Sequence, residues 1–212
     1  NVEVIANNLA NMNTTGYKVQ RAEFQDLLYQ DVERPGDTTS DANTVLPSGI
    51  QIGVGVRTAA TYRVVGQGNL TSTDNPYDLA IQGQGFFHIQ MPDGSDAYSR
   101  DGAFSLSPDG QIVTAKGYVV APGISIPQAA TSVSINAQGQ VTANVAGSGP
   151  QTLGQIELAR FPNEGGLEAK GDNLFVESPA SGAALAGVPG SPGFGTLSQG
   201  FLETSNVNPV QE

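Results

Sequence analysis

Residues 86–120 alternate short apolar runs with turn signals, and this pattern limits the possible folds more than any other feature of the chain. The turn signals are Pro92-Asp93-Gly94, Arg100-Asp101-Gly102, Pro108-Asp109-Gly110 and Lys116-Gly117. Asp-Gly between β-prone runs favours a hairpin, because glycine adopts the positive φ that a tight connection between right-twisted strands needs. The pattern predicts an all-β domain of many short antiparallel strands joined by Asp-Gly hairpin turns.

The composition suits such a domain and excludes several partners. The 212 residues include 27 Gly and 13 Pro, which favour short strands and long loops. A formal net charge of −11 disfavours nucleic acid and anionic membrane surfaces as partners. The chain has no cysteine, so disulfides, thiolate metal sites and cysteine nucleophiles are absent. No apolar run approaches the ~20 residues of a membrane-spanning helix.

The side chains offer little of what an enzyme needs. His88 is the single histidine, and it lies in the β-prone run FFHIQ with no second titrating partner implied nearby. One histidine without cysteine is too few nitrogen and sulfur ligands for a zinc site. Most acidic residues belong to Asp-Gly turns, where the side chain accepts hydrogen bonds from its own backbone. We therefore expect no catalytic residue, no metal and no cofactor.

The N-terminal residues 1–13 carry one helical stripe, because Val2, Ile5, Leu9 and Met12 are spaced by three or four positions. Two interpretations fit equally well. The helix could lie on the β domain, or it could be half of a helix pair whose partner is elsewhere. The following residues 16–29 could form either a second short helix or an extended arm.

The next segment changes character twice. Residues 30–48 are polar and contain Pro35-Gly36, which is typical of a linker. Apolar residues then occupy every second position from Ile50 to Val56, and the same phase continues to Val64. This alternation predicts one long half-buried strand. Glycines on its other face would make it flat enough to pair with another chain.

The C-terminal third is expected to continue the strands to residue 203. Residues 178–195 are rich in Gly, Ala and Pro and predict a mobile surface loop. Residues 204–212 predict the start of a helix, with Ser205 or Asn206 as its N-cap. The expected divisions are a helix and arm at 1–29, an extended insertion at 30–61, a β domain at 62–201 and a helix start at 202–212.

Several stretches resemble bacterial flagellar rod and hook proteins. The stretches ANNLANMNTTGYKVQRAEF (6–24) and ETSNVNPVQE (203–212) resemble the two terminal motifs of that family. Residues 81–120 resemble its first β domain. The stretch 26–57 is similar to the long insertion of the distal rod subunit. Hook subunits lack this insertion and carry a further β domain, for which this chain has no room.

The resemblance implies a structural subunit of the distal rod, which assembles with copies of itself into a rigid helical shaft and carries motor torque to the hook. It implies terminal helices, cut short here, that pair into an inner tube around the export channel. The insertion would bridge neighbouring subunits. Further implied partners are proximal rod and hook (or hook-junction) subunits and the surrounding ring proteins. The implied location is the periplasmic part of the basal body, reached by type III export without signal cleavage.

The residues implied in assembly belong to the two terminal motifs and the insertion. They are Asn7, Asn8, Leu9, Ala10, Asn11, Thr15, Gly16, Tyr17, Lys18, Phe24, Leu46, Pro47, Ile50, Ile52, Val54, Val56, Ser205, Asn206, Val207 and Asn208.

Three alternatives stay open at this point. One is a proximal rod or hook subunit of the same family. Another is a secreted β-sandwich module that binds glycans, although the lack of Trp weakens it. The third is a peptidoglycan-cleaving enzyme, which would need two acidic side chains facing each other across a cleft.

Overall fold

The computed structural model describes residues 2–33 and 50–210, and their contacts divide into two units. One unit is residues 20–62, which we call the arm. The other joins residues 2–19 to the chain from Arg63 onward, and we call it the body. The predicted all-β class with a short N-terminal helix is confirmed. The predicted boundaries differ, because the N-terminal helix and the C-terminal segment make their contacts with the β domain.

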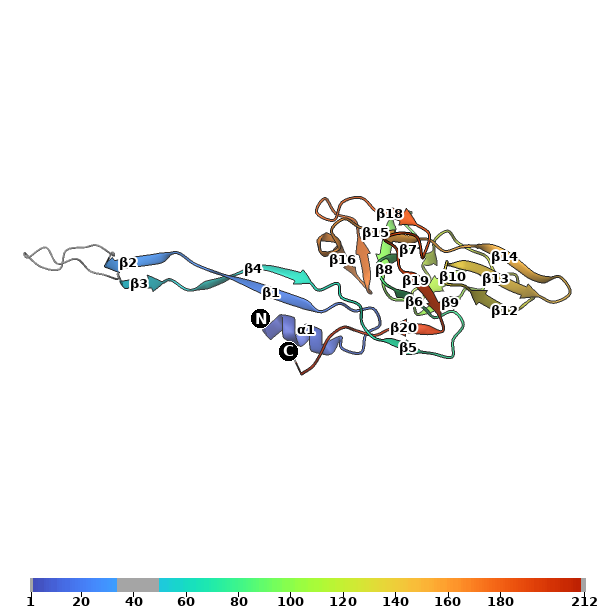
Figure 1. The fold of residues 1–212 in the computed structure, drawn as a ribbon, viewed down its shortest axis with the longest axis horizontal. Coiled ribbons are helices and arrows are strands. Elements are labelled where there is room, and N and C mark those ends of the chain that lie inside the picture. Colours follow the sequence, from blue (N-terminus) through green and yellow to red (C-terminus); the bar gives the residue numbers. More distant parts are fainter. Residues whose placement is uncertain (1, 34–49, 211–212) are drawn as a thin grey trace, which may run out of the picture. The chain divides into compact units, whose positions relative to one another are not determined.

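Figure 1 labels the elements along the chain. The helical elements are α1 (Val2–Ala10) and the 3₁₀ turn η1 (Glu164–Gly166). The strands of the arm are β1 (Gln20–Asp26), β2 (Tyr29–Glu33), β3 (Ile50–Gly53) and β4 (Val56–Arg63, the last residue of which belongs to the body). The strands of the body are β5 (Leu70–Ser72), β6 (Leu79–Gln82), β7 (Phe86–Gln90), β8 (Asp96–Ser99), β9 (Phe104–Leu106), β10 (Ile112–Thr114), β11 (Val119–Val120), β12 (Ala130–Ile135), β13 (Gln140–Val145), β14 (Gly149–Gln155), β15 (Leu158–Arg160), β16 (Glu168–Gly171), β17 (Leu174–Val176), β18 (Leu185–Gly187), β19 (Thr196–Gln199) and β20 (Phe201–Glu203).

The largest sheet of the body is built around β7. Its hydrogen-bonded order is β16-β17-β8-β7-β11-β10-β9, and β15 pairs with both β7 and β18. Side chains alternate across a strand, so adjacent Phe86 and Phe87 point to opposite faces. Phe87 lies in the main core and meets Phe104 edge-on, with ring centroids 5.0 Å apart. Phe86 lies in a second cluster with Phe161 and other aromatic residues. The beginning of β7 is therefore buried on both faces, as two adjacent phenylalanines require, whereas Gln90 at its end is exposed.

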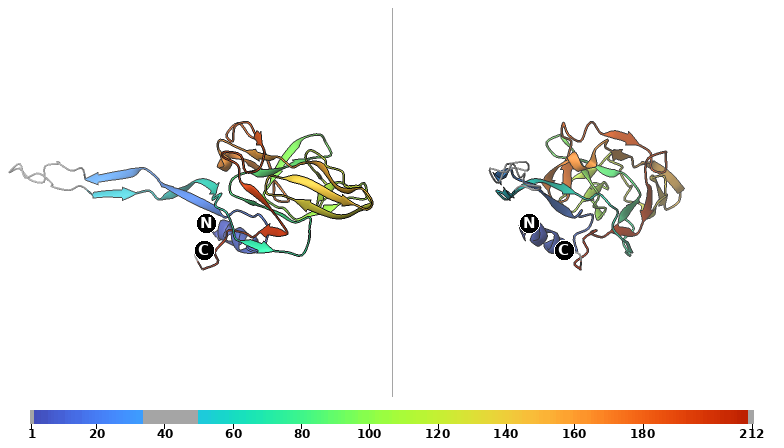
Figure 2. Two further views of the ribbon diagram at one scale, coloured as in Figure 1. Left: turned by 45° about the vertical axis from the view of Figure 1, so that its right-hand side comes forward. Right: turned by 60° about the vertical axis from the view of Figure 1, so that its left-hand side comes forward.

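The main core lies where the large sheet meets the three-stranded sheet β12-β13-β14, whose strands are yellow in Figure 2. Ile135 and Val141 from that sheet pack in the same cluster as Ile89 and Leu158 from the large sheet. Leu79 and Leu197, from the paired strands β6 and β19, complete it. The apolar core of the body is therefore built from strands of three sheets.

Three of the four predicted turns in residues 86–120 connect paired strands. They join β7 to β8, β9 to β10 and β10 to β11. The prediction at Arg100-Asp101-Gly102 was wrong, since β8 pairs with β7 and β17 and does not pair with β9. Gly102 instead pairs its carbonyl with the amide of Leu79, and Arg100 is buried. The buried Arg100 thus lies where the sequence predicts a hairpin turn.

Residues 178–195 are more than the predicted surface loop. They contain β18, which pairs in register with β15, and they bury Ser181 and Pro189 completely. Small side chains allow this close approach, so low complexity here reflects tight packing.

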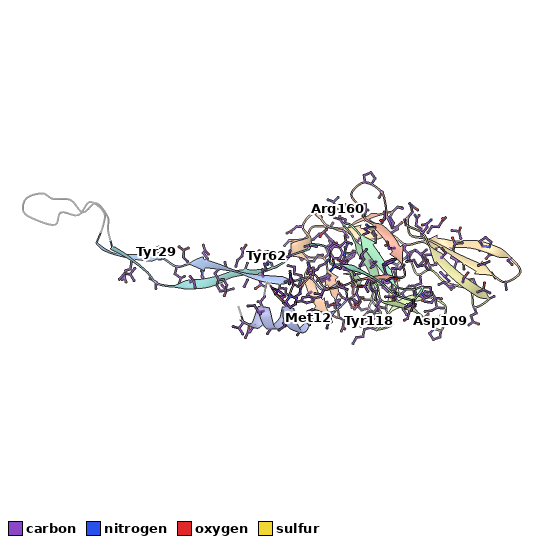
Figure 3. The ribbon with its side chains drawn as sticks, turned by 60° about the horizontal axis from the view of Figure 1, so that its bottom comes forward. Met12, Tyr29, Tyr62, Asp109, Tyr118 and Arg160 are labelled. Carbon is purple, nitrogen blue, oxygen red and sulfur yellow. The ribbon has the colours of Figure 1, made fainter. Side chains whose placement is uncertain are left out.

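The arm is a two-stranded ribbon. Strand β1 pairs with β4, and antiparallel β2 pairs with β3. The predicted continuous strand from Ile50 to Val64 is broken between β3 and β4 at Gly55, whose φ of +124° ends the regular pairing. The prediction of a half-buried face was also wrong, because the described side chains from Ile52 to Tyr62 are exposed. Figure 3 shows side chains on both sides of this ribbon. Residues 16–29, left open by the sequence, are extended from Gln20.

Within residues 2–33 and 50–210, no helix has the length and apolar character to cross a membrane.

Candidate assembly site

Several asparagines of the N-terminal motif make hydrogen bonds within and beside α1. The Tyr17 hydroxyl donates to the side-chain oxygens of Asn7 and Asn8, at 2.9 and 3.1 Å. Asn11 donates from its side chain to the carbonyl of Asn7 at 2.9 Å. Asn8 is fully buried, whereas Leu9 and the other apolar residues of the helical stripe are partly or largely exposed. The polar face of the helix thus anchors it, and the predicted apolar stripe stays uncovered in the single chain.

After α1, the backbone of Gly16 packs closely against the backbone of Asp101. Its φ is +66°, and a Cβ added there would lie 2.7 Å from the backbone nitrogen of Asp101. The Gly16 amide donates to the carbonyl of Glu203 at 2.8 Å. The preceding Thr15 donates from its hydroxyl to the carboxylate of Asp101 at 2.8 Å. Only glycine fits this position without strain, which links the motif to the segment around residue 203.

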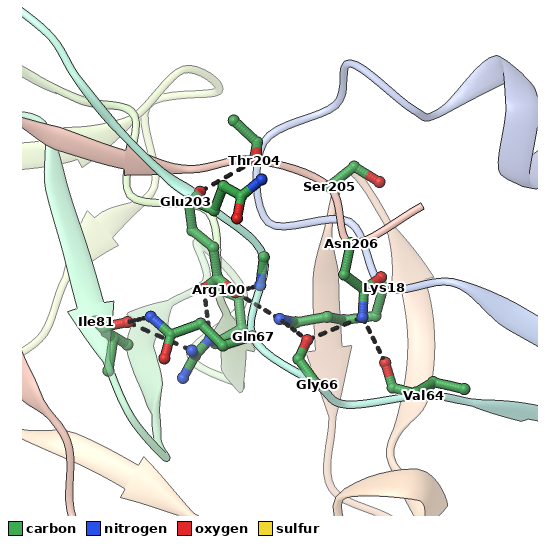
Figure 4. Close-up of polar contacts among 12 residues, drawn as sticks. Lys18, Val64, Gly66, Gln67, Ile81, Arg100, Glu203, Thr204, Ser205 and Asn206 are labelled. Atoms are coloured by element: carbon green, nitrogen blue, oxygen red, sulfur yellow. Dashed lines mark hydrogen bonds and ion pairs between the residues drawn. The ribbon is translucent and has the colours of Figure 1, made fainter. Parts of the chain in front are cut away.

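Next to Gly16, three charged side chains meet inside the body. Lys18 Nζ lies 2.6 Å from Glu203 Oε1, and Arg100 Nε lies 3.0 Å from Glu203 Oε2. All three residues are at most 5% exposed. Figure 4 shows them reaching one another from three separate segments of the chain. We call Lys18, Arg100, Glu203 and the neighbouring Asn206 the clasp.

The remaining hydrogen-bonding capacity of the clasp is met by backbone groups. Lys18 donates to the carbonyl of Gly66 at 2.9 Å, and Glu203 accepts from the amide of Gly68 at 2.8 Å. Arg100 donates to the carbonyls of Gly83 and Gly85 at 2.9 and 2.6 Å. A buried charge is tolerated when such partners replace water, so the clasp demands this one arrangement of its segments.

Asn206 completes the clasp by joining three stretches of backbone. Its side-chain oxygen accepts from the amide of Val19 at 2.7 Å, and its side-chain nitrogen donates to the carbonyls of Val64 and Gly66 at 2.9 and 2.8 Å. The amide of Val64 in turn donates to the carbonyl of Val19 at 2.9 Å. The N-terminal motif therefore lies hydrogen-bonded between residues 64–66 and the C-terminal segment.

Burial sets the electrostatics of the clasp. Desolvation lowers the pKa of the Lys18 ammonium, and its hydrogen bond and ion pair with Glu203 act against that shift. Burial also raises the pKa of the nearby Glu164 carboxyl, against the attraction of Arg100, Arg160 and Lys18. The two buried cations thus depend on acidic partners, of which Glu203 alone touches both.

The predicted helix start at 204–212 was wrong for the residues described, since none from Thr204 to Val210 is helical. Neither predicted N-cap begins a helix. Asn206 uses its side chain in the clasp, and the buried Ser205 accepts from the amide of Val207 at 3.3 Å. Asn208 accepts from the amide of Val210 at 3.1 Å, which is a local turn. Tertiary hydrogen bonds have taken the groups that a cap would use.

The predicted site residues thus separate into two groups. One group lies in the body, where its residues hydrogen-bond to one another or to their neighbours: Asn7, Asn8, Asn11, Thr15 to Lys18, Ser205, Asn206 and Val207. Phe24, Ile52, Val54 and Val56 lie in the arm, where they are exposed, and Ile50 begins β3. Leu46 and Pro47 lie outside the described residues. Ala10 ends α1 and is exposed.

Sequence reasoning missed Arg100, Glu203 and the glycine backbone that receives them. Arg100 lies in a stretch whose sequence predicts a turn, and Glu203 is the first residue of the C-terminal motif. The C-terminal motif has two acidic residues, Glu203 and Glu212, and no signal in the sequence selects Glu203 as the partner of Lys18. Nothing in the sequence marks the Arg100 contacts.

The sequence implied no titrating partner near His88, and the structure places an acidic one in contact with it. Its Nε2 lies 2.7 Å from Asp96 Oδ1, and its ring stacks on Tyr98. A hollow of about 270 Å³ beside it is lined by Gln90, Pro122 and Glu157 among others. No group of three His, Cys, Asp or Glu side chains suited to a metal occurs in the described part of the chain.

Comparison with known proteins identifies the family. The model of the "Flagellar hook protein FlgE/F/G D1 domain" matches residues 80–143, and that of the "Flagella basal body rod protein" matches residues 1–18. The whole chain is 56% identical to the flagellar basal-body rod protein FlgG of Caulobacter vibrioides and covers 81% of it. It is 39% identical to FlgG of Bacillus subtilis over 81% of that protein, and 32% identical to FlgF of Caulobacter vibrioides over 78% of that one. The chain therefore belongs to the flagellar basal-body rod proteins, a family of structural proteins and not of enzymes.

Proposed function

We propose that this chain is the subunit of the flagellar distal rod, and that it assembles with copies of itself into a stiff helical shaft that carries motor torque to the hook. One copy contacts the next through different surfaces, and contacts of this kind that do not close into a ring produce a helical filament. Proximal rod and hook subunits would meet the two ends of the shaft, and ring proteins would surround it. Export by the type III apparatus and a periplasmic position belong to the same proposal.

The observation that carries the proposal is the uncovered apolar surface of the arm. Leu28 is 87% exposed, and Ile52, Val54 and Val56 are each more than half exposed. An isolated two-stranded ribbon is marginally stable in water, so such a ribbon needs further packing. Neighbouring copies in a filament would supply it. The resemblance of residues 26–57 to the distal rod insertion supports the distal type over the proximal one.

The body supports the proposal in a different way. Its clasp fixes the terminal motifs on a rigid β block by directional hydrogen bonds. A shaft that transmits torque needs subunits that do not deform between their inner and outer contacts. A buried, fully bonded polar network meets that need because it stabilises a single arrangement.

A charge placed on the arm tests the proposal. Val54→Asp or Val56→Asp should leave thermal unfolding of the purified chain unchanged, since both side chains are exposed. In a motile bacterium whose own rod gene carries the same change, we expect basal bodies without a complete distal rod in electron micrographs. Thr58→Asp is the matched control, because it adds the same charge at an exposed polar position of β4, the strand that begins at Val56. Complete rods with both valine variants would overturn the proposed contact.

A deletion tests the stiffness. Removing residues 31–45 should leave the body folded and yield a rod that bends more easily. Straight and equally stiff rods from the deletion variant would contradict the role of the insertion as a tie between subunits.

A further inference from the structure

The clasp joins the beginning of the chain to its end. Lys18 and Glu203 are 185 positions apart, and each is buried by the contact. The same two segments share two backbone hydrogen bonds: the Gly16 amide donates to the carbonyl of Glu203, and the Asn206 amide donates to the carbonyl of Tyr17. Neither terminal segment therefore has its observed contacts without the other.

Glu203 is the centre of this arrangement. Its carboxylate accepts from Lys18, Arg100 and the Gly68 amide, so one side chain balances two buried cations. If the C-terminal segment were undocked, Lys18 and Arg100 would face each other without an anion in contact. Burying an unpaired ammonium is far more costly than leaving it in water, so the N-terminal motif would not dock.

Removing Lys18 disrupts less of the clasp than removing Glu203 does. Without Lys18, Glu203 keeps Arg100 and the Gly68 amide. The C-terminal segment would still lose the Val19 amide as a donor to Asn206, and with it one of the links across the clasp. The two segments consequently stabilise each other in both directions.

We infer that the clasp is a co-docking latch, in which residues 15–19 bind the body only when residues 203–206 are bound, with Glu203 as the positioning residue. The two terminal segments are then held on the body as a pair or released as a pair. The latch is a property of the single chain. Its use, which is to hand both terminal motifs to the assembly in one fixed geometry, rests on the function proposed above.

Hydrogen exchange of the purified chain with Glu203→Gln tests the latch. The reporter of N-terminal docking is the amide of Val64, which donates to the carbonyl of Val19. The amide of Val19, which donates to Asn206, reports the contact between the two terminal segments. We expect both amides to exchange on the order of 100-fold faster in the variant, the effect of breaking a buried ion pair. The amides of the core strands β7 and β13 should keep their rates, because local opening leaves the rest of the body folded.

Lys18→Met supplies the reciprocal measurement. The reporter of C-terminal docking is the amide of Thr204, which donates to the carbonyl of Asn69. Coupling between two binding events is mutual, so loss of Lys18 should accelerate exchange at Thr204, as loss of Glu203 accelerates it at Val19. Lys170→Met and Glu168→Gln are the matched controls, since both change an exposed side chain of the same charge as the one tested.

Two results would overturn the latch. In one, Glu203→Gln accelerates Thr204 and Val19 and leaves Val64 protected, which means that the N-terminal segment stays docked without the C-terminal one. In the other, terminal and core amides accelerate by the same factor, which means that the clasp is an ordinary part of the global core. If Glu203→Gln does not fold, Lys18→Met decides between the same outcomes, because it leaves Glu203 paired with Arg100. These measurements use unassembled protein, so a failure to form rods would count against the proposed function and not against the latch.

Discussion

The arm and the body both contain alternating apolar residues, with opposite burial. In β13 of the body the alternating Val141 and Ala143 are buried, and from Ile52 to Val56 of the arm the alternating apolar side chains are exposed. Both stretches alternate in the way that predicts a sheet with one apolar face. The comparison shows that alternation identifies which residues share a face, while the cover over that face comes from segments far away in the sequence or from another molecule.

The largest expected effect separates the two regions directly. Phe87→Ala removes a fully buried ring from the core and should lower the free energy of unfolding by about 3–5 kcal/mol. Phe24→Ala, on the exposed side of the arm, should change it by less than about 0.5 kcal/mol. Urea denaturation followed by circular dichroism measures both. Equal losses at the two positions would refute the contrast between a covered and an uncovered surface.

A smaller effect is expected at Gly16, beside the clasp. Gly16→Ala forces a Cβ against the backbone of Asp101 at a positive φ, and should destabilise the body by about 2 kcal/mol. Gly117→Ala is the matched control, because its φ of +85° is equally unusual but the space around it is open. Thermal unfolding of the two variants gives the comparison. A larger loss at Gly117 would show that backbone conformation, and not close approach, decides the choice of glycine.

Within the arm, effects should be smaller still. Tyr29 lies opposite Gly53, and its ring is 3.3 Å from where a Cβ of that glycine would be. Tyr29→Ala should weaken the pairing of β2 with β3 by about 0.5 kcal/mol. Faster exchange of the Val54 amide, which donates to the carbonyl of Leu28, reports this loss. Leu28→Ala, an exposed neighbour, should leave the exchange rate unchanged.

The smallest effect is a dependence on pH at Glu164. Its pKa is raised by burial above the ordinary 4.5, so the protonated form favours the folded state. That contribution is complete below pH 4.5 and is lost as the pH rises through the folded pKa. Glu164→Gln should therefore raise the melting temperature at pH 7 by on the order of 1 °C, and the difference should vanish near pH 4. The exposed Glu168→Gln is the control, and a stabilisation that persists unchanged at pH 4 would contradict this origin.

Much of the fold could be predicted from local signals. Two Asp-Gly turns and one Lys-Gly turn identified three hairpins, and apolar periodicity identified α1 and most strands of the body. Local signals failed where tertiary contacts took over the same residues. Arg100 follows β8 in a stretch with a turn-like sequence. Its buried guanidinium donates hydrogen bonds to Glu203 and to two glycine carbonyls.

Only part of the candidate site could be predicted from the sequence, for the same reason. The terminal motifs could be found by their resemblance to a family, which identified Gly16, Lys18 and Asn206 as candidate assembly residues. The pairing of Lys18 with Glu203 could not, because a single sequence carries no information about two positions that lie 185 residues apart. Exposure of the arm was equally hidden, since its alternation is the same as that of a buried strand.

The covering of Phe86 and Phe87, on opposite faces of β7, affects how variants of this protein should be interpreted. The flanks of this strand are also occupied, by β8, β11 and β15. A substitution at Phe86 or Phe87 should therefore reduce motility by lowering the amount of folded protein in the cell. A substitution at an exposed position such as Leu185 leaves abundance intact, and any defect it causes is mechanical. Measuring protein level beside swimming speed would sort the two kinds of variant.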